Sequence, residues 1–357
     1  MRTTTISHEQ LAALLADLIA AGTTVIAPAR AERGHVDYWP VSSLAEVDLG
    51  GAMPRRSLKE LFLPPTEPLL AWQYRQGGVE ISEVATAFPP RVVLGARPCD
   101  AAGLVAVDRV MDWDYHDELW FGRRAATTIL SLVCSAVDSS CFCRAVGLAP
   151  DTTRGADILL RPTATSFLVE VITEKGEALV AAHPDRFKSA PEPLVPQDTV
   201  GRAGSGPRAP SPAPLPLPEI RSWLETHFEH PIWKELALRC HGCGACAAVC
   251  PTCHCFDIVD ETEGVTHGTR RRNWDTCQTG RFTIHASGHN PRADQTARIR
   301  QRVMHKFAIY PAKFGETLCS GCGRCARECP AGMDLPEILA LLTTLATAPT
   351  QRTEVVA

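Results

Sequence analysis

The chain has 357 residues, a length that predicts two domains at roughly 100 to 200 residues each. Hydrophobic residues make up 45% and charged residues 21%, which are ordinary values for a globular protein and exclude a mainly disordered or fibrous chain. The formal net charge is −4, so the chain lacks the strongly basic character of a dedicated nucleic-acid-binding protein. We therefore expect no nucleic-acid partner.

An apolar run over residues 11–22 near the N-terminus could suggest a signal peptide, but Asp17 interrupts it. Ser7 and Gln10 form a capping-box pattern just before the run, which favours a surface helix. No stretch contains the 18 or more uncharged apolar residues of a membrane-spanning helix. These features predict a cytoplasmic protein without direct membrane insertion.

Residues 1–200 have the pattern of an α/β domain. After the first helix, short runs rich in β-branched residues predict strands at residues 23–27, 91–95, 127–133 and 166–172. Cys99 lies just beyond the second of these strands and Cys134 just beyond the third. In open α/β sheets ligands bind in the loops that follow strand ends, so both positions suggest a site.

Residues 201–218 contain six prolines and three glycines, a composition that predicts an extended linker. Apolar residues at helical spacing predict helices at residues 219–239, 296–307 and 335–345, with a short strand at 256–260. We expect a mainly helical domain over residues 219–347, with a flexible tail at 348–357.

The 15 cysteines are the most unusual feature of the composition. Four lie in the first half of the chain, and the other eleven fall between Cys240 and Cys329. Disulfide-rich proteins are usually small and secreted, and an odd number of cysteines cannot all pair. This distribution indicates metal ligation or redox chemistry.

The most specific motif is a run of four cysteines followed by proline, with the spacing C-x2-C-x2-C-x3-C-P, which occurs twice. This is the bacterial-ferredoxin spacing, in which three thiolates hold one [4Fe–4S] cluster and the fourth ligates the other cluster. Zinc sites use two ligand pairs separated by a longer loop and fit this run poorly. The spacing therefore predicts a ferredoxin-like domain with two [4Fe–4S] clusters, although each run could instead hold its own cluster. The crossed assignment gives Cys240, Cys243, Cys246 and Cys329 to the first, and Cys319, Cys322, Cys325 and Cys250 to the second.

Seven cysteines remain after this assignment. Four of them could hold a third [4Fe–4S] cluster, or could be buried thiols of the kind common in protein cores. The other three are predicted to pack as small apolar side chains, with roles as substitute ligands left open. The first group is Cys99, Cys134, Cys141 and Cys143, and the second is Cys253, Cys255 and Cys277.

Basic residues are concentrated between His267 and Lys306, where acids are few. This excess could balance the negative charge of thiolate-ligated clusters, form a docking face for an acidic partner, or be a solvated helix face. Its members are Arg270, Arg271, Arg272, Arg281, Arg292, Arg298, Arg300, Arg302 and Lys306, against Asp275 and Asp294.

Longer stretches around these motifs match one known family. They include ELALRCHGCGACAAVCPTCHCFDIVDE, RRRNWDTCQTGRFTIHASGHNPR and CSGCGRCARECPAGMDL in the second half, and LGARPCDAAGL and RRAATTILSLVCSAVDSSCFC in the first. In these stretches the chain resembles the beta subunits of sulfhydrogenases (soluble nickel–iron hydrogenases) and the corresponding subunits of anaerobic sulfite reductases. The resemblance implies an electron relay that receives electrons from a flavin subunit served by NAD(P)H. The receiving partner would be the hydrogenase small and large subunits, or else a sulfite reductase subunit.

Two functional hypotheses follow, from different classes. No G-x-G-x-x-G, G-K-S/T or H-E-x-x-H motif occurs, so nucleotide and zinc-protease chemistry lack their usual signatures. The first hypothesis is therefore an electron-transfer component that is not catalytic alone. The alternative is a chain with its own flavin or deazaflavin catalytic site in the N-terminal domain.

Overall fold

In the computed structural model, residues 2–31, 34–50, 53–135, 138–189 and 214–348 are described. The predicted linker lies mostly outside these ranges, as does nearly all of the predicted C-terminal tail. The boundaries drawn from the sequence at 200 and 219 therefore stay predictions.

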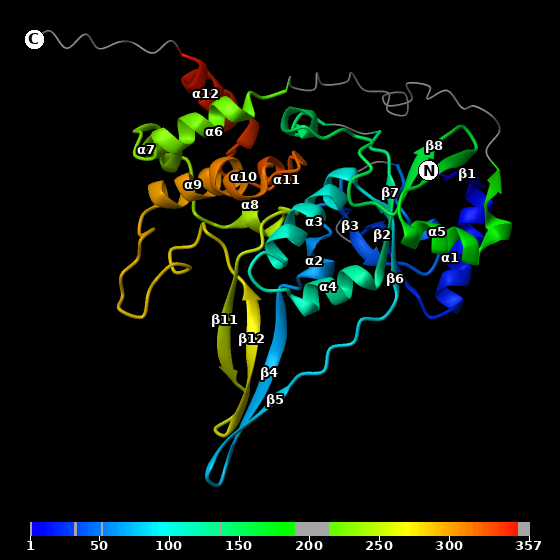
Figure 1. The fold of residues 1–357 in the computed structure, drawn as a ribbon, viewed down its shortest axis with the longest axis horizontal. Helices are drawn as coiled ribbons and strands as arrows, with labels where there is room; N and C mark the ends of the chain where they lie inside the picture. Colours follow the sequence, from blue (N-terminus) through cyan, green and yellow to red (C-terminus); the bar gives the residue numbers. More distant parts are fainter. Residues whose placement is uncertain (1, 32–33, 51–52, 136–137, 190–213, 349–357) are drawn as a thin grey trace, which may run out of the picture.

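The N-terminal part contains a mixed sheet of eight strands in the order β10-β1-β9-β8-β7-β6-β2-β3 (Figure 1). Its four central strands run parallel: β2 (Thr24–Arg30), β6 (Arg91–Ala96), β7 (Thr127–Leu132) and β8 (Ile158–Pro162). The strands at the two sides are antiparallel to their neighbours: β3 (Val36–Pro40), β9 (Ser166–Val171), β1 (Arg2–Ser7) and β10 (Lys188–Ser189).

Apolar side chains of the central strands point alternately to the two faces of the sheet, and helices cover each face. Val92 and Leu94 face α1 (His8–Ala20) and α5 (Glu174–Ala182), whereas Val93 faces the other layer. That layer consists of α2 (Lys59–Phe62), α3 (Pro98–Met111) and α4 (Glu118–Ala125). The α/β architecture predicted for this part is thus a mixed sheet between two helical layers.

The first helix begins where the sequence predicts. Ser7 is its N-cap, and the Ser7 hydroxyl accepts a hydrogen bond from the backbone N–H of Gln10 at 3.1 Å. Its buried residues are all leucines that face the sheet: Leu11, Leu14, Leu15 and Leu18.

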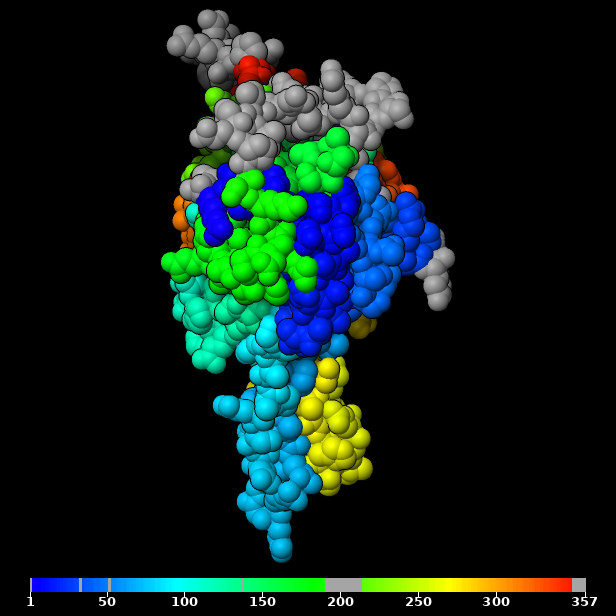
Figure 2. Space-filling model, turned by 90° about the vertical axis from the view of Figure 1, so that its right-hand side faces the viewer, coloured from blue at the N-terminus to red at the C-terminus, as the bar shows by residue number. Residues whose placement is uncertain are grey.

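A second sheet joins the two halves of the chain. It has the antiparallel order β11-β12-β4-β5, formed by β4 (Thr66–Arg75), β5 (Gly78–Glu83), β11 (Phe256–Thr262) and β12 (His267–Trp274). Figures 1 and 2 show this sheet projecting from the body of the molecule as a narrow arm, which we call the sheet arm. Because β4 pairs with β12, strands from before and after the predicted linker share one hydrogen-bonded ladder.

The C-terminal part is built from helices around its own apolar core. They are α6 (Leu217–Thr226), α7 (Ile232–Leu238), α9 (Gln295–Met304), a π-helical turn η4 (His305–Ile309), α10 (Tyr310–Phe314) and α12 (Leu335–Thr347). Trp233, Phe307 and Leu339 are among the buried residues of this core. The same part also supplies β11 and β12, so the expectation of a mainly helical domain is not confirmed in that form.

Candidate metal centres

The two cysteine runs have the same local structure. In each, a glycine-containing loop leads into a single helical turn, α8 (Ala245–Ala248) in the first run and α11 (Arg324–Arg327) in the second. Gly244 and Gly323 precede these turns with φ of 76° and 72°, a left-handed conformation that favours glycine. The two turns pack against each other.

Backbone N–H groups in these loops point at thiols. The N–H of Gly242 lies 3.5 Å from the Cys240 sulfur, and the N–H of Gly321 lies 3.4 Å from the Cys319 sulfur. Such N–H···S contacts stabilise a thiolate and help set the potential of a bound cluster. The loops therefore present their cysteines in a form suited to metal ligation.

A cysteine of the first run lies among cysteines of the second run. Cys250, the last cysteine of the first run, interacts electrostatically with Cys319 and Cys322 of the second run. Cys322 in turn interacts with Cys325. Cys250 thus lies among the three thiols with which crossed ligation would group it.

The thiols of the first group, around Cys246, differ in exposure from those of the second group, around Cys322. Cys246 interacts with Cys240 of its own run and with Cys325 of the other. Cys243 is exposed, whereas Cys250 and Cys322 are buried. The first group of thiols therefore includes one that reaches the protein surface, while two thiols of the second group are buried.

Several buried cations lie beside these thiols. The Lys306 amine lies 3.4 Å from the Cys250 sulfur and also donates to the Thr252 hydroxyl and the Leu318 carbonyl. Arg302 interacts chiefly with thiols, those of Cys246 and Cys325 first. Within the described ranges no carboxylate forms an ion pair with Arg302 or Lys306, and the Arg302 Nε–H has no hydrogen-bond partner.

Buried cations require a compensating negative charge. Although burial alone would lower the pKa of Lys306, the nearby Cys250 and Cys253 thiols raise it above its ordinary value. Burial raises the pKa of the Cys319 thiol to about 12, so this thiol is neutral unless a metal displaces its proton. Thiolate-ligated iron–sulfur clusters would supply the missing negative charge, and the residues present therefore fit such clusters.

Lys59 is also a buried cation beside these thiols, and it comes from the N-terminal part. Its amine donates to the Ala247 carbonyl at 3.2 Å and lies 3.8 Å from the centre of the Trp274 ring. It interacts with Cys253 and Cys250. Sequence reasoning missed Lys59, because nothing near KELF marks a lysine that contacts a loop almost two hundred residues away.

The basic stretch of the sequence does not form one surface. Arg302 and Lys306 are buried against thiols, as the charge-balance interpretation predicts. Arg272 is buried too, but it pairs with Glu67 and Asp117 of the N-terminal part. The exposed Arg270 pairs with Asp260 at 2.7 Å, whereas no ion pair of the exposed Arg281 is found among the described residues.

The three unassigned cysteines lie beside the predicted ligands. Cys253 lies beside Cys250, and Cys255 lies beside Cys277. Gln278 donates to the Cys277 sulfur at 3.5 Å. Their predicted role as packing side chains stays a prediction.

The four cysteines of the N-terminal part meet in one place. Cys99, Cys134, Cys141 and Cys143 line a single small pocket, which Cys322 of the second run also borders. Next to it, the carboxylate of Asp100 forms a two-pronged ion pair with Arg324, at 2.6 Å for both contacts, and both side chains are fully buried. Sequence reasoning did not foresee this ion pair.

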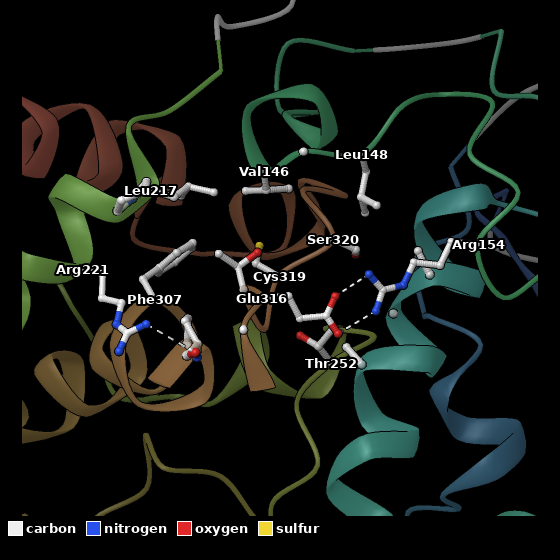
Figure 3. A pocket seen from close by; sticks show the side chains of 18 of the residues that line it. Val146, Leu148, Arg154, Leu217, Arg221, Thr252, Phe307, Glu316, Cys319 and Ser320 are labelled. Atoms are coloured by element: carbon white, nitrogen blue, oxygen red, sulfur yellow. Dashed lines mark hydrogen bonds and ion pairs between the residues drawn. The ribbon is translucent and has the colours of Figure 1, made fainter. Parts of the chain in front are cut away.

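A larger cavity of about 540 Å³ lies between the two parts of the chain (Figure 3). Cys319 and Ser320 lie at its wall, and Val146, Leu148 and Phe307 add apolar surface. The Ser320 hydroxyl is buried without a hydrogen-bond partner among the described residues. The cavity is thus adjacent to the buried group of thiols.

Two negative findings apply to the described residues. No three His, Cys, Asp or Glu side chains there are close enough together to hold a single metal ion. No helix in the same ranges is both long and apolar enough to span a membrane.

Comparisons with known proteins define the class of the C-terminal part first. Residues 239–333 match the model of the 4Fe-4S dicluster domain family. This match supports bound [4Fe–4S] clusters and covers all eight cysteines of the doubled run.

A comparison over most of the chain identifies a particular relative. The chain is 29% identical over 305 residues to the sulfhydrogenase 2 subunit beta of Pyrococcus furiosus, an alignment that covers 84% of this chain and 86% of the relative. No solved structure matches significantly. The resemblance to sulfhydrogenase beta subunits predicted from the sequence is confirmed.

Proposed function

We propose that this chain is the iron–sulfur electron-transfer subunit of a multisubunit oxidoreductase. It would relay single electrons from an NAD(P)H-linked flavin subunit to a catalytic partner, a nickel–iron hydrogenase first and a sulfite reductase second. The name of the Pyrococcus furiosus relative, a subunit of a sulfhydrogenase, supports the hydrogenase assignment.

The observation that carries the proposal is the pairing of interleaved thiols with buried cations that have no carboxylate partner. Bound [4Fe–4S] clusters exchange one electron at a time. The residues that would hold them are Cys240, Cys243, Cys246 and Cys329 in one centre, and Cys250, Cys319, Cys322 and Cys325 in the other. Lys306 and Arg302 would offset their negative charge in the protein interior.

The exposure of the two groups of thiols suggests which centre faces a partner protein. Cys243 is exposed, so the first centre is the one that a partner protein can approach closely. Cys322 is buried and lies against the N-terminal part, so the second centre connects to the interior.

The sheet arm supports the assignment to a complex. Every residue of β5 is exposed, and Tyr74, Val79 and Ile81 are large apolar side chains with exposures of 56%, 51% and 65%. Trp72 and Tyr74 of β4 lie opposite Ile81 and Val79 of β5, so these four side chains share one face. Exposed apolar surface on an unpaired edge strand is typical of a surface covered by a partner.

The proposal is tested by purifying the chain under strict exclusion of oxygen and counting its metals. We expect at least about eight iron atoms and eight sulfides per chain, from four of each per cluster. We also expect a reduced-cluster EPR signal after dithionite. Zinc in place of iron and sulfide would contradict the proposal.

The alternative function, a flavin or deazaflavin site of the chain's own, has one observation in its favour. The cavity beside Cys319 has a volume of about 540 Å³, within the range of small-molecule sites, and it carries the unpartnered Ser320 hydroxyl. Flavin released on denaturing the purified chain, together with dye reduction by NAD(P)H without any other subunit, would favour this alternative over the relay.

A further inference from the structure

The fold brings four cysteines together from separate segments. β6 and β7 are neighbouring parallel strands, so the segments that follow them leave the sheet at the same edge. Cys99 lies in the first turn of α3, directly after β6, and Cys134 follows β7. Cys141 and Cys143 come from the loop beyond Cys134, which ends in the 3-10 turn η2 (Cys143–Val146).

The pocket that these cysteines line offers thiols and little else. The rest of its lining is Met53, Pro98, Ala149, Pro150, Gly321 and Cys322. Among the described residues its lining contains no carboxylate, imidazole or amide side chain. Apart from the thioether of Met53, thiols are thus the only side chains of that lining that could ligate iron.

The four thiols are arranged around the pocket rather than at one point. Cys99 interacts with Cys134, and Cys143 interacts with both Cys141 and Cys134. Among the described residues, no group of three His, Cys, Asp or Glu side chains that could hold a single metal ion is found. Zinc needs its four ligands to converge on one atom, whereas a cubane keeps its four ligands apart at separate irons.

The second cysteine run closes the pocket on one side. A methyl group on Gly321 would lie 2.5 Å from the Cα of Cys143, and one on Gly323 would lie 2.4 Å from the carbonyl oxygen of Ser140. The N–H of Phe142 donates to the Gly321 carbonyl at 2.8 Å. The loop that carries Cys141 and Cys143 is therefore fixed, backbone against backbone, on the loop that carries Cys322.

A buried charge lies between the two groups of thiols. Arg324 interacts with both Cys322 and Cys99, and its only carboxylate partner among the described residues is Asp100. Arg327 adds a contact at the rim, where its Nη1 atom lies 3.9 Å from the Cys141 sulfur and its Nη2 atom donates to the Cys322 carbonyl. Arg327 is also paired with a carboxylate, that of Asp138, so this boundary is built from two ion pairs that tie the second cysteine run to the N-terminal part.

We infer that Cys99, Cys134, Cys141 and Cys143 hold a third [4Fe–4S] cluster, adjacent to the Cys322 side of the buried C-terminal centre. The three centres then form a row, from the α/β part through the buried centre to the exposed Cys243. The electron-transfer role of this site rests on the proposed function, but its existence as a cluster site does not.

Metal content of the full chain tests this inference. We expect about twelve iron atoms and twelve sulfides per chain, and three reduced-cluster spins on integration of the EPR signal after dithionite. The double variant Cys141→Ala/Cys143→Ala should lose about four of each and one spin. Met53→Leu, which alters the same pocket without removing a thiol, should retain all twelve.

The possible results separate this inference from the proposed function. Eight irons and two spins in the unaltered chain would overturn the third cluster but leave the proposed function intact, as would eight irons with one zinc. A chain without iron would overturn both. If the double variant does not fold, the spin count of the unaltered chain alone decides between two clusters and three.

Discussion

At the scale of single residues, the proposed function depends on buried positive charges that would be unfavourable without a nearby negative charge. Lys306 donates to the Cys250 sulfur and to two protein oxygens, but it has no carboxylate partner in the parts of the chain described. A positive charge beside a cluster favours the reduced form, because reduction adds negative charge. Lys306 is therefore expected to raise the reduction potential of the centre that contains Cys250.

Replacing this lysine should lower that potential. For Lys306→Met we expect a decrease on the order of 100 mV, since a buried charge a few ångströms away contributes a few kcal/mol and 59 mV corresponds to about 1.4 kcal/mol for one electron. EPR-monitored redox titration measures the change, and Lys306→Arg should show little of it. An unchanged potential in Lys306→Met, with iron content retained, would show that the amine does not act on the cluster.

The buried ion pair between Asp100 and Arg324 is the second feature at this scale. Both side chains are fully buried, and the Tyr38 hydroxyl donates to Asp100 at 2.8 Å. Burial and the neighbouring Asp100 carboxylate raise the pKa of Tyr38 well above its ordinary value, so its hydroxyl remains a donor. The pair connects the first turn of α3 to the second cysteine run.

Breaking this pair from one side should be costly. Asp100→Asn leaves a buried guanidinium without its counter-charge, and we expect a loss of about 3 to 5 kcal/mol in the free energy of unfolding. The double variant Asp100→Asn/Arg324→Met should recover part of it, since no uncompensated charge remains. Anaerobic denaturant unfolding measures both, and Asp138→Asn, which breaks the exposed pair with Arg327, should cost less than about 1 kcal/mol.

At the scale of elements, the sheet arm is the clearest candidate for partner contact. Its edge strand β5 is exposed at every position and presents Val79 and Ile81 on one face. Interfaces depend on a few large apolar side chains near their centre. The arm can therefore contribute to assembly without touching any cysteine.

A charge on the apolar face of the arm should weaken assembly and nothing else. For Ile81→Lys we expect at least a tenfold loss in affinity for the partner subunit, with iron content and EPR signals unchanged. Ser82→Lys places the same charge on the opposite face of the strand and serves as the matched control. Equal co-purification of partners with both variants and the unaltered chain would exclude the arm as the interface.

The elements also show what sequence patterns could predict. Buried strands such as β6 and β7, and helices with an apolar face such as α1, follow from local pattern. β5 and β12 were missed because β5 has no buried position and β12 is a run of polar and basic residues without alternation. The pairing of β12 with β4 depends on residues about two hundred positions apart, which no local pattern records.

Some features of the candidate centres could likewise be predicted from local sequence patterns, and others could not. The spacing of the eight C-terminal cysteines is a local signal and was sufficient to predict cluster chemistry. The meeting of Cys99 and Cys134 followed from their positions after strand ends, although their contact with the Cys322 loop did not. Lys59 and Asp100 could not be predicted, because their partners come from the other half of the chain.

At the scale of the whole molecule, several contacts join the two halves of the chain, and three of them bear on the proposed centres. β4 pairs with β12, the Cys143 loop rests on Gly321, and Asp100 pairs with Arg324. The last two contacts lie next to the predicted ligands. Such an arrangement fixes the separation of the proposed centres, on which electron transfer between them depends.

The central claim is that this chain transfers electrons which another subunit must deliver. It is tested most directly by the EPR signal of the anaerobic chain after addition of NAD(P)H, with and without the co-purifying flavin subunit. We expect no reduced-cluster signal from NAD(P)H alone, and the full dithionite-level signal once the flavin subunit is present. Full reduction by NAD(P)H without any partner, or the absence of a cluster signal even with dithionite, would contradict it.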